Sequence, residues 1–297
     1  MTLPLSETSL RSSVSIKTAS GVMTCSWQPA RDGARGGARS LPANGADGAQ
    51  DTAFPRPPLH GKFCLMVARV WHAVIAMLVL AAIIVQVVVA IRVSGSPHET
   101  TAGLLRGSST AGRVFRVFSF FTIQSNLLSG LVSWQLAVRP DRDGPVWRAV
   151  RLAALFGITV TGIGYSAVLA DIHEPHGVAE TFVNDLVHYV VPVMMVVGWL
   201  AFGPRPRIDR GTVLRSLWFP VLWMIYTLFR GAVWDWYPYP FLDVPSNGYT
   251  RVLINAVVAT VVLAGVAGLY TFGDRRLPAS PSTGHDQFTP VAGASSA

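Results

Sequence analysis

Residues 70–91 read VWHAVIAMLVLAAIIVQVVVAI and contain no Asp, Glu, Lys or Arg. A helix of about 20 such residues is long enough to cross the ~30 Å hydrocarbon core of a bilayer. The chain of 297 residues is 51% hydrophobic and only 13% charged, and a typical soluble domain carries about twice that charge. These features predict an integral membrane protein.

Apolar segments of similar length recur along the chain. Six are present, at 68–92, 118–138, 148–170, 186–203, 213–233 and 250–272. We therefore predict an all-α polytopic membrane protein whose six transmembrane helices form one bundle over residues 63–273. The flanking segments 1–62 and 274–297 are expected to be disordered tails, because they cannot bury enough apolar surface to offset the entropy of ordering.

The arginines set the expected orientation. The segments 139–151 and 205–215, together with Arg275 and Arg276, fall on one side of a six-helix protein. The positive-inside rule makes that side cytoplasmic, so both termini are predicted to be cytoplasmic and the protein to lie in the cell membrane. The loop 93–117 also carries arginines and is the exception. The net charge of +8 is assigned to these loops, and no nucleic-acid partner is expected.

Given this orientation, polar residues of five helices are expected at one depth, in the outer third of the membrane. Thr122, Ser125, Asn126 and Ser129 stand at i, i+3, i+4 and i+7, so they share one helix face. The other helices contribute Tyr165, Asp185, His188, Tyr226, Arg230 and Asn255. Polar and charged residues within membrane helices are rare and commonly functional, so this layer is predicted to form a pocket.

Simpler roles exist for the same residues. Serine and threonine hydroxyls often only join helices, at about 0.6 kcal/mol each, and a single membrane histidine is commonly structural. Arg230 can extend to the interface, and the aromatic residues of 234–241 can form an interfacial belt. These roles do not explain why the polar groups converge on one side of the membrane.

Metal and haem chemistry are not favoured by the histidines. His72 is expected near the cytoplasmic side and His188 near the outer side, which disfavours a haem held by both. The segment 173-HEPH-176 has imidazole and carboxylate ligands but matches no strong zinc spacing. We therefore expect no metal and no cofactor.

Three segments resemble a known family. They are 120-FFTIQSN-126, then 184-NDLVHYVVP-192 with a His four residues before a Pro, and 223-WMIYTLFRGAVWDWYPYPFLD-243, which ends in an aromatic-Pro-Phe-Leu-acid run. In order, spacing and helix count they are similar to the androgen-induced and androgen-dependent TFPI-regulating protein family of multi-pass membrane proteins. The resemblance covers residues 65–272. Abundant Arg, Ala and Gly are typical of a GC-rich bacterial genome, so the chain resembles a bacterial member.

The resemblance implies an integral membrane hydrolase of lipid esters, such as fatty acid esters of hydroxy fatty acids. It implies Thr122 as the nucleophile and His188 as the base. Donors to the developing oxyanion, or contacts to substrate, are sought among Asn126, Arg230, Asn255, Tyr165 and Tyr226. Asp185, one helical turn from His188, is expected to orient it or to cap its helix, with Ser125 as a further supporting residue. Arg230 stands where animal members have other residues, so a relative is expected to keep the fold and alter the substrate.

Two other functions remain open. One is a non-enzymatic protein that binds or transports a small amphiphile through the same pocket, and the other is an oxidoreductase subunit that binds a quinone or haem. An enzyme must place the Thr122 hydroxyl within about 3 Å of His188, or one water away. A transporter needs a polar path to the inside, which the aliphatic inner halves oppose. The expected partner is a membrane lipid or acyl ester, and the oligomeric state is open.

Overall fold

The computed structural model describes residues 59–92, 108–171, 173, 175 and 177–278, with side chains from residue 62 onward, and two short strands near the N-terminus. The predicted tails, 1–62 and 274–297, lie largely outside the described residues. Where they are described, residues 59–62 and 274–276 continue the first and last helices.

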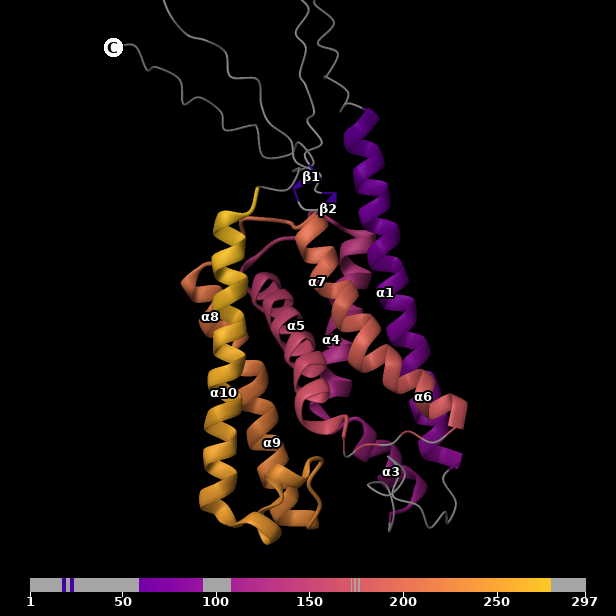
Figure 1. Cartoon of the computed structure of the whole chain (residues 1–297), viewed down its shortest axis with the longest axis vertical. Helices are drawn as coiled ribbons and strands as arrows, with labels where there is room; N and C mark the ends of the chain where they lie inside the picture. The colour runs from indigo at the N-terminus through magenta and orange to yellow at the C-terminus, as the bar shows by residue number, and fades with distance from the viewer. Residues whose placement is uncertain are drawn as a thin grey trace, which may run out of the picture.

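The structure is a bundle of helices (Figure 1). In chain order its elements are β1 (Thr18–Ala19), β2 (Val22–Met23), α1 (Leu59–Arg92), α3 (Thr110–Val117), α4 (Phe121–Val138), α5 (Pro145–Gly164), η1 (Tyr165–Leu169), α6 (Gly177–Asp185), η2 (Leu186–Val190), α7 (Val191–Phe202), α8 (Arg210–Ser216), α9 (Trp218–Trp234), η3 (Pro240–Leu242) and α10 (Val244–Arg276). The two strands pair antiparallel. The elements η1 and η2 are π-helical turns, whereas η3 is a 3₁₀ turn.

Helices long and apolar enough to cross a membrane confirm the predicted membrane class. Five segments qualify, and they are Lys62–Arg92, Pro145–Leu169, Gly177–Phe202, Arg210–Trp234 and Val244–Arg276. The remaining predicted segment forms α4, which has 18 residues and is not among the five. Its amides and hydroxyls lower its mean hydropathy, and 11 of its residues are buried, where it packs against α1 and α5.

The surface of α1 is apolar, as expected for a helix in lipid. One face is exposed and carries Val70, Val74, Met77, Leu80, Ile84 and Ile91. A soluble monomer rarely exposes so long an apolar stripe. The opposite face is buried, and there Val79 meets α4 at Gly130. A Cβ added at Gly130 would lie 2.9 Å from Val79 Cγ1, so glycine permits this close helix approach.

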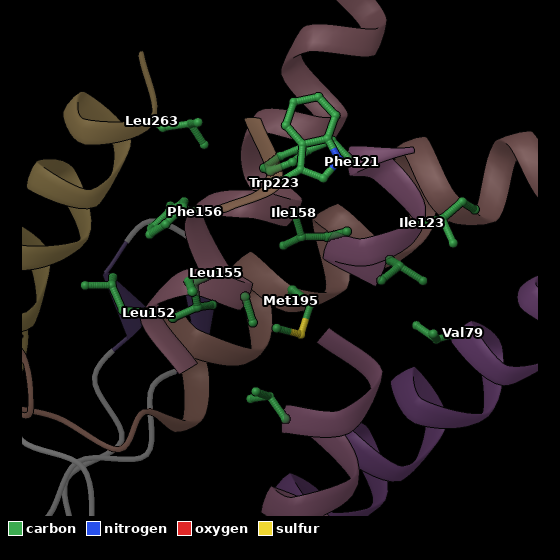
Figure 2. Close-up of a cluster of buried hydrophobic side chains, with 14 of the residues drawn as sticks. Val79, Phe121, Ile123, Leu152, Leu155, Phe156, Ile158, Met195, Trp223 and Leu263 are labelled. Carbon is green, nitrogen blue, oxygen red and sulfur yellow. The ribbon is translucent and has the colours of Figure 1, made fainter. Parts of the chain in front are cut away.

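The centre of the bundle is α5. Residues 151–158 are all buried, and a helix that is buried on every side lies inside its protein. Figure 1 shows α5 between α10 and the pair α4 and α7. Figure 2 shows four side chains of α5 together with side chains of the helices around it. Those of α5 are Leu152, Leu155, Phe156 and Ile158, and the others are Phe121, Ile123, Met195, Trp223 and Leu263. This packed core fixes the helices that carry the polar residues.

Two segments that lie between the predicted transmembrane helices are partly helical. Most of 171–185 forms α6, which continues through η2 into α7. The reason is a small apolar cluster of Val183, Leu186 and Val187 with Ala82 of α1, which gives α6 a buried face. Similarly, the end of 93–117 forms α3.

The arginine-bearing segments meet at one end of the bundle. The backbone N–H groups of Arg207 and Ile208 donate to Asp274 Oδ2 at 2.6 and 2.7 Å. Arg207 also donates to the carbonyl of Arg142 at 3.0 Å. The two loops and the end of α10 are therefore tied together.

Candidate functional site

Thr122 lies in the first turn of α4, where the backbone N–H groups have no partner within the helix. The residue at the N-cap of α4, Phe120, makes no side-chain cap hydrogen bond. Instead, the Tyr239 hydroxyl, from the loop between α9 and α10, accepts from Thr122 N at 3.3 Å. The same hydroxyl lies 3.4 Å from Thr122 Oγ1. Thr122 is only 9% exposed, so a distant loop closes over the start of α4.

Asn126, one turn further along α4, joins this helix to η2. Its fully buried side chain donates to the carbonyl of Thr122 at 2.9 Å and to the carbonyl of Val187 at 3.1 Å. In a π-helical turn, the N–H of residue i+5 pairs with the carbonyl of residue i. For Val187 that residue is Pro192, which has no N–H, and the N–H of Val191 goes to Leu186. Asn126 therefore satisfies a carbonyl that the backbone leaves free.

His188 lies in η2 and stacks on Tyr165 of η1. The two ring centroids are 3.7 Å apart and the planes differ by 12°. The helices approach closely here because α5 has Gly162. A Cβ added there would lie 3.0 Å from Pro192 Cβ and 3.1 Å from the carbonyl oxygen of His188. Single π-turns inside helices occur frequently at functional sites, and here two such turns face each other.

Thr122 and His188 lie on helices that the Asn126 amide joins. Among the described residues of 108–278, however, no hydrogen bond links their side chains. The Thr122 hydroxyl pairs with Tyr239, whereas His188 Nδ1 pairs with Asn184 Oδ1 at 2.9 Å. With that oxygen as acceptor, Nδ1 carries the proton and Nε2 keeps a free lone pair. Asp185, expected to orient His188 or to cap its helix, is exposed and makes no side-chain cap hydrogen bond to η2. The residue that pairs with the His188 ring is Asn184.

Tyr226 and Arg230 of α9 belong to a neighbouring cluster centred on Ser119. The Ser119 hydroxyl lies 2.8 Å from the Tyr226 hydroxyl and accepts from Arg230 Nη1 at 2.7 Å. Trp223 Nε1 donates to the carbonyl of Ser119 at 3.0 Å. Arg230 is 5% exposed. These bonds fix the short link between α3 and α4, directly before Thr122.

The two clusters share the loop between α9 and α10. The ring of Phe120 packs edge-on against both Trp236 and Tyr239, with centroids 5.8 and 5.7 Å apart. Asn255 holds the loop from the other side, because its amide donates to the carbonyl of Phe241 at 2.8 Å. Asn255 therefore positions the loop that carries Tyr239.

Ser125 and Ser129 pack inside the bundle. Both are fully buried, and the Ser129 hydroxyl donates to the carbonyl of Ser125 at 2.8 Å. The Ser125 hydroxyl has no partner among the described residues and faces Gly157, where an added Cβ would lie 3.0 Å away. These contacts indicate a packing role for both serines.

Three residues of the site were missed from the sequence. Asn184 stands four residues before His188, and that spacing alone was enough to find it. Ser119 belongs to the same polar stretch as Thr122. Tyr239 lies in the aromatic run 234–241, for which an interfacial belt was one of the possible roles, and only the fold shows that its hydroxyl returns to α4. Because burial raises the pKa of the Tyr239 phenol, this group stays a neutral hydrogen-bond donor.

The described residues contain no group of three His, Cys, Asp or Glu side chains that could hold a metal ion. Glu174 and His176 of the segment 173–176 lie outside them. Comparison with protein-family models, curated proteins and solved structures gives no match for this chain.

Proposed function

We propose that this chain is a membrane-embedded hydrolase of lipid esters, with Thr122 as nucleophile and His188 as base. The observation that carries the proposal is the buried amide of Asn126, which joins the carbonyl of Thr122 to that of Val187. This bridge holds a half-buried imidazole and a buried hydroxyl on adjoining helices. The imidazole is oriented by Asn184 so that Nε2 is free to accept a proton.

The reaction proceeds by acyl transfer. A threonine hydroxyl needs a base to become nucleophilic. On substrate binding, the long hydrogen bond from Thr122 to Tyr239 gives way, and Thr122 Oγ1 attacks the ester carbonyl carbon as its proton passes to His188 Nε2. The alcohol leaves and takes that proton. A water molecule, deprotonated by His188, then attacks the acyl-threonine, so the acid is released and the Thr122 hydroxyl is restored.

The oxyanion formed in each step needs a donor. Both amide N–H groups of Asn126 are already bonded to carbonyls, so Asn126 acts by holding the helices. Arg230 Nη1 is bonded to Ser119 in the neighbouring cluster, so we do not assign Arg230 to this donor role. The Tyr239 hydroxyl lies 3.4 Å from Thr122 Oγ1, and we assign this donor role to it.

We further propose that α4 is a sixth membrane span, protected from lipid by its neighbours, and that both termini face the cytoplasm of a cell-membrane protein. The clustering of arginines at one end of the bundle supports this orientation. Thr122 and His188 then lie toward the outer leaflet. An acyl chain in lipid and an ester near the interface would suit that depth.

A second candidate is non-enzymatic binding of an amphiphile. The observation that favours it is the Thr122–Tyr239 hydrogen bond, because Thr122 has no bond to a base. A binding protein would retain its ligand unchanged, whereas a hydrolase would release acid and alcohol.

The test is an activity-based experiment on the full chain in detergent or nanodiscs. Wild type should hydrolyse long-chain esters and react with a fluorophosphonate probe, whereas Thr122→Ala and His188→Ala should lose both activities. The matched control is Thr227→Ala, which removes a different buried hydroxyl. The Thr227 hydroxyl has no hydrogen-bond partner in the described structure, so this variant should behave as wild type. Full activity in well-folded Thr122→Ala would refute the assignment, and intact ester bound to inactive wild type would favour the second candidate.

A further inference from the structure

Arg230 is a buried cation held between aromatic rings. Its guanidinium carbon lies 4.4 Å from the ring centre of Trp236 and 4.8 Å from that of Phe115. Its Nη1 donates to Ser119, but its Nε is buried and has no partner in the described structure. The aromatic faces and one hydroxyl compensate the positive charge only partly.

No acidic side chain of the described residues forms a salt bridge with Arg230. The recorded ion pairs involve Asp143 at the opposite, arginine-rich end of the bundle. A buried charge without a counter-charge is unfavourable. The surroundings of Arg230 are therefore those of a site that gains from an anion.

A second cation lies beside the first. The guanidinium carbon of Arg116, on α3, is 5.1 Å from the ring centre of the same Trp236. Burial, and next the charge of Arg230, lower the pKa of Arg116. Two like charges thus share one indole, and an anion placed near both would offset their mutual repulsion.

We propose that Arg230, Arg116 and Trp236 form a binding site for a phosphate-bearing anion, which nothing in the ester-hydrolase proposal requires. Guanidinium groups bind phosphate oxygens through paired, charge-assisted hydrogen bonds. Two of them match the double negative charge of a phosphate monoester better than the single charge of a carboxylate. The partly buried Trp236 and the exposed Phe115 surround the site with rings suited to the headgroup level of a membrane.

The same chemistry is offered by a lipid headgroup and by free phosphate, and the experiment distinguishes them. The full chain is placed in nanodiscs of phosphatidylcholine alone or mixed with phosphatidic acid, and its thermal unfolding is followed. The phosphatidylcholine sample is also titrated with inorganic phosphate against chloride at constant ionic strength. A bound ligand raises the unfolding temperature as its concentration exceeds its dissociation constant.

The variants are Arg230→Gln and Arg116→Gln, with Arg275→Gln at the opposite end as control. We expect wild type and the control to be stabilised by phosphatidic acid, by phosphate or by both. The affinity of each site variant for the same anion should fall by about tenfold or more. If Arg230→Gln does not fold, Arg116→Gln decides the question, because Arg116 is partly exposed.

Two results would overturn the proposal. The first is that wild type responds to neither probe. The second is that both site variants keep the wild-type response, which places the anion elsewhere. Stabilisation by phosphatidic acid alone assigns the site to lipid, and stabilisation by free phosphate assigns it to a soluble anion. Because the readout is stability, it is independent of whether the chain hydrolyses esters.

Discussion

Replacement of Asn126 by alanine tests the link between the two halves of the site. The change removes the side-chain donor to the carbonyl of Val187. Residue 192, whose backbone N–H would otherwise pair with that carbonyl in the π-turn, is a proline. A buried carbonyl left without a partner costs about 1–3 kcal/mol. We expect the free energy of unfolding to fall by about that amount. The bond to the Thr122 carbonyl adds less, because the α4 backbone also serves that group.

A second substitution isolates the cause. Pro192→Ala supplies a backbone N–H next to the free carbonyl, so Asn126→Ala should cost less in that background. We expect a coupling energy of about 1 kcal/mol between the two changes. Ser129→Ala is the matched control on the same helix face. Its hydroxyl bonds only to the carbonyl four residues earlier, and its loss should cost about 0.6 kcal/mol whichever residue is present at position 192.

The assay is equilibrium unfolding in mixed micelles, with far-ultraviolet ellipticity as the probe. Four proteins complete the cycle, namely wild type, the two single variants and the double variant. If Asn126→Ala costs the same with proline or alanine at position 192, Asn126 does not replace the missing backbone donor, and the reasoning fails.

Three further changes test separate parts of the structure. Gly162→Ala should destabilise by about 1–3 kcal/mol through overpacking, whereas Gly164→Ala, which meets nothing within 4 Å, should be neutral or stabilising in the same assay. Tyr239→Phe should keep the ring packing but lower the rate of ester hydrolysis about 100-fold, as measured by product release. A hydrogen bond from Arg148 lowers the pKa of Asp143 from 3.8 to about 2. The stability from this exposed pair, below about 1 kcal/mol, is therefore present above pH 3.8 and lost as the pH falls toward 2. Thermal unfolding of Asp143→Asn should lack this loss.

The membrane class could be predicted from the sequence because long uncharged apolar segments are typical of membrane-spanning helices. The polar face of 118–138 was also correctly located, since helical spacing alone places Thr122, Asn126 and Ser129 together. Helix lengths were less predictable. The acidic segment 171–185 lay outside the predicted helices, yet Val183, together with Leu186 of the following π-turn, gives it a buried face against α1.

The detailed contacts of the site depended on the fold. Tyr239 reaches Thr122 over 117 residues of sequence, and no local pattern records such a contact. The contact between Asn126 and the carbonyl of Val187 likewise depends on two features together. The π-turn assigns that carbonyl to the N–H of residue 192, and Pro192 has no N–H. Spacing predicts which residues share a face, whereas hydrogen-bond partners depend on how the helices dock.

The most direct test of the proposed chemistry is peptide mapping by mass spectrometry after reaction with a fluorophosphonate or a slowly hydrolysed ester. The account predicts a covalent adduct on Thr122, absent from His188→Ala and retained in Thr227→Ala. An adduct on Ser125 or on any other residue, with Thr122 unmodified, would contradict it.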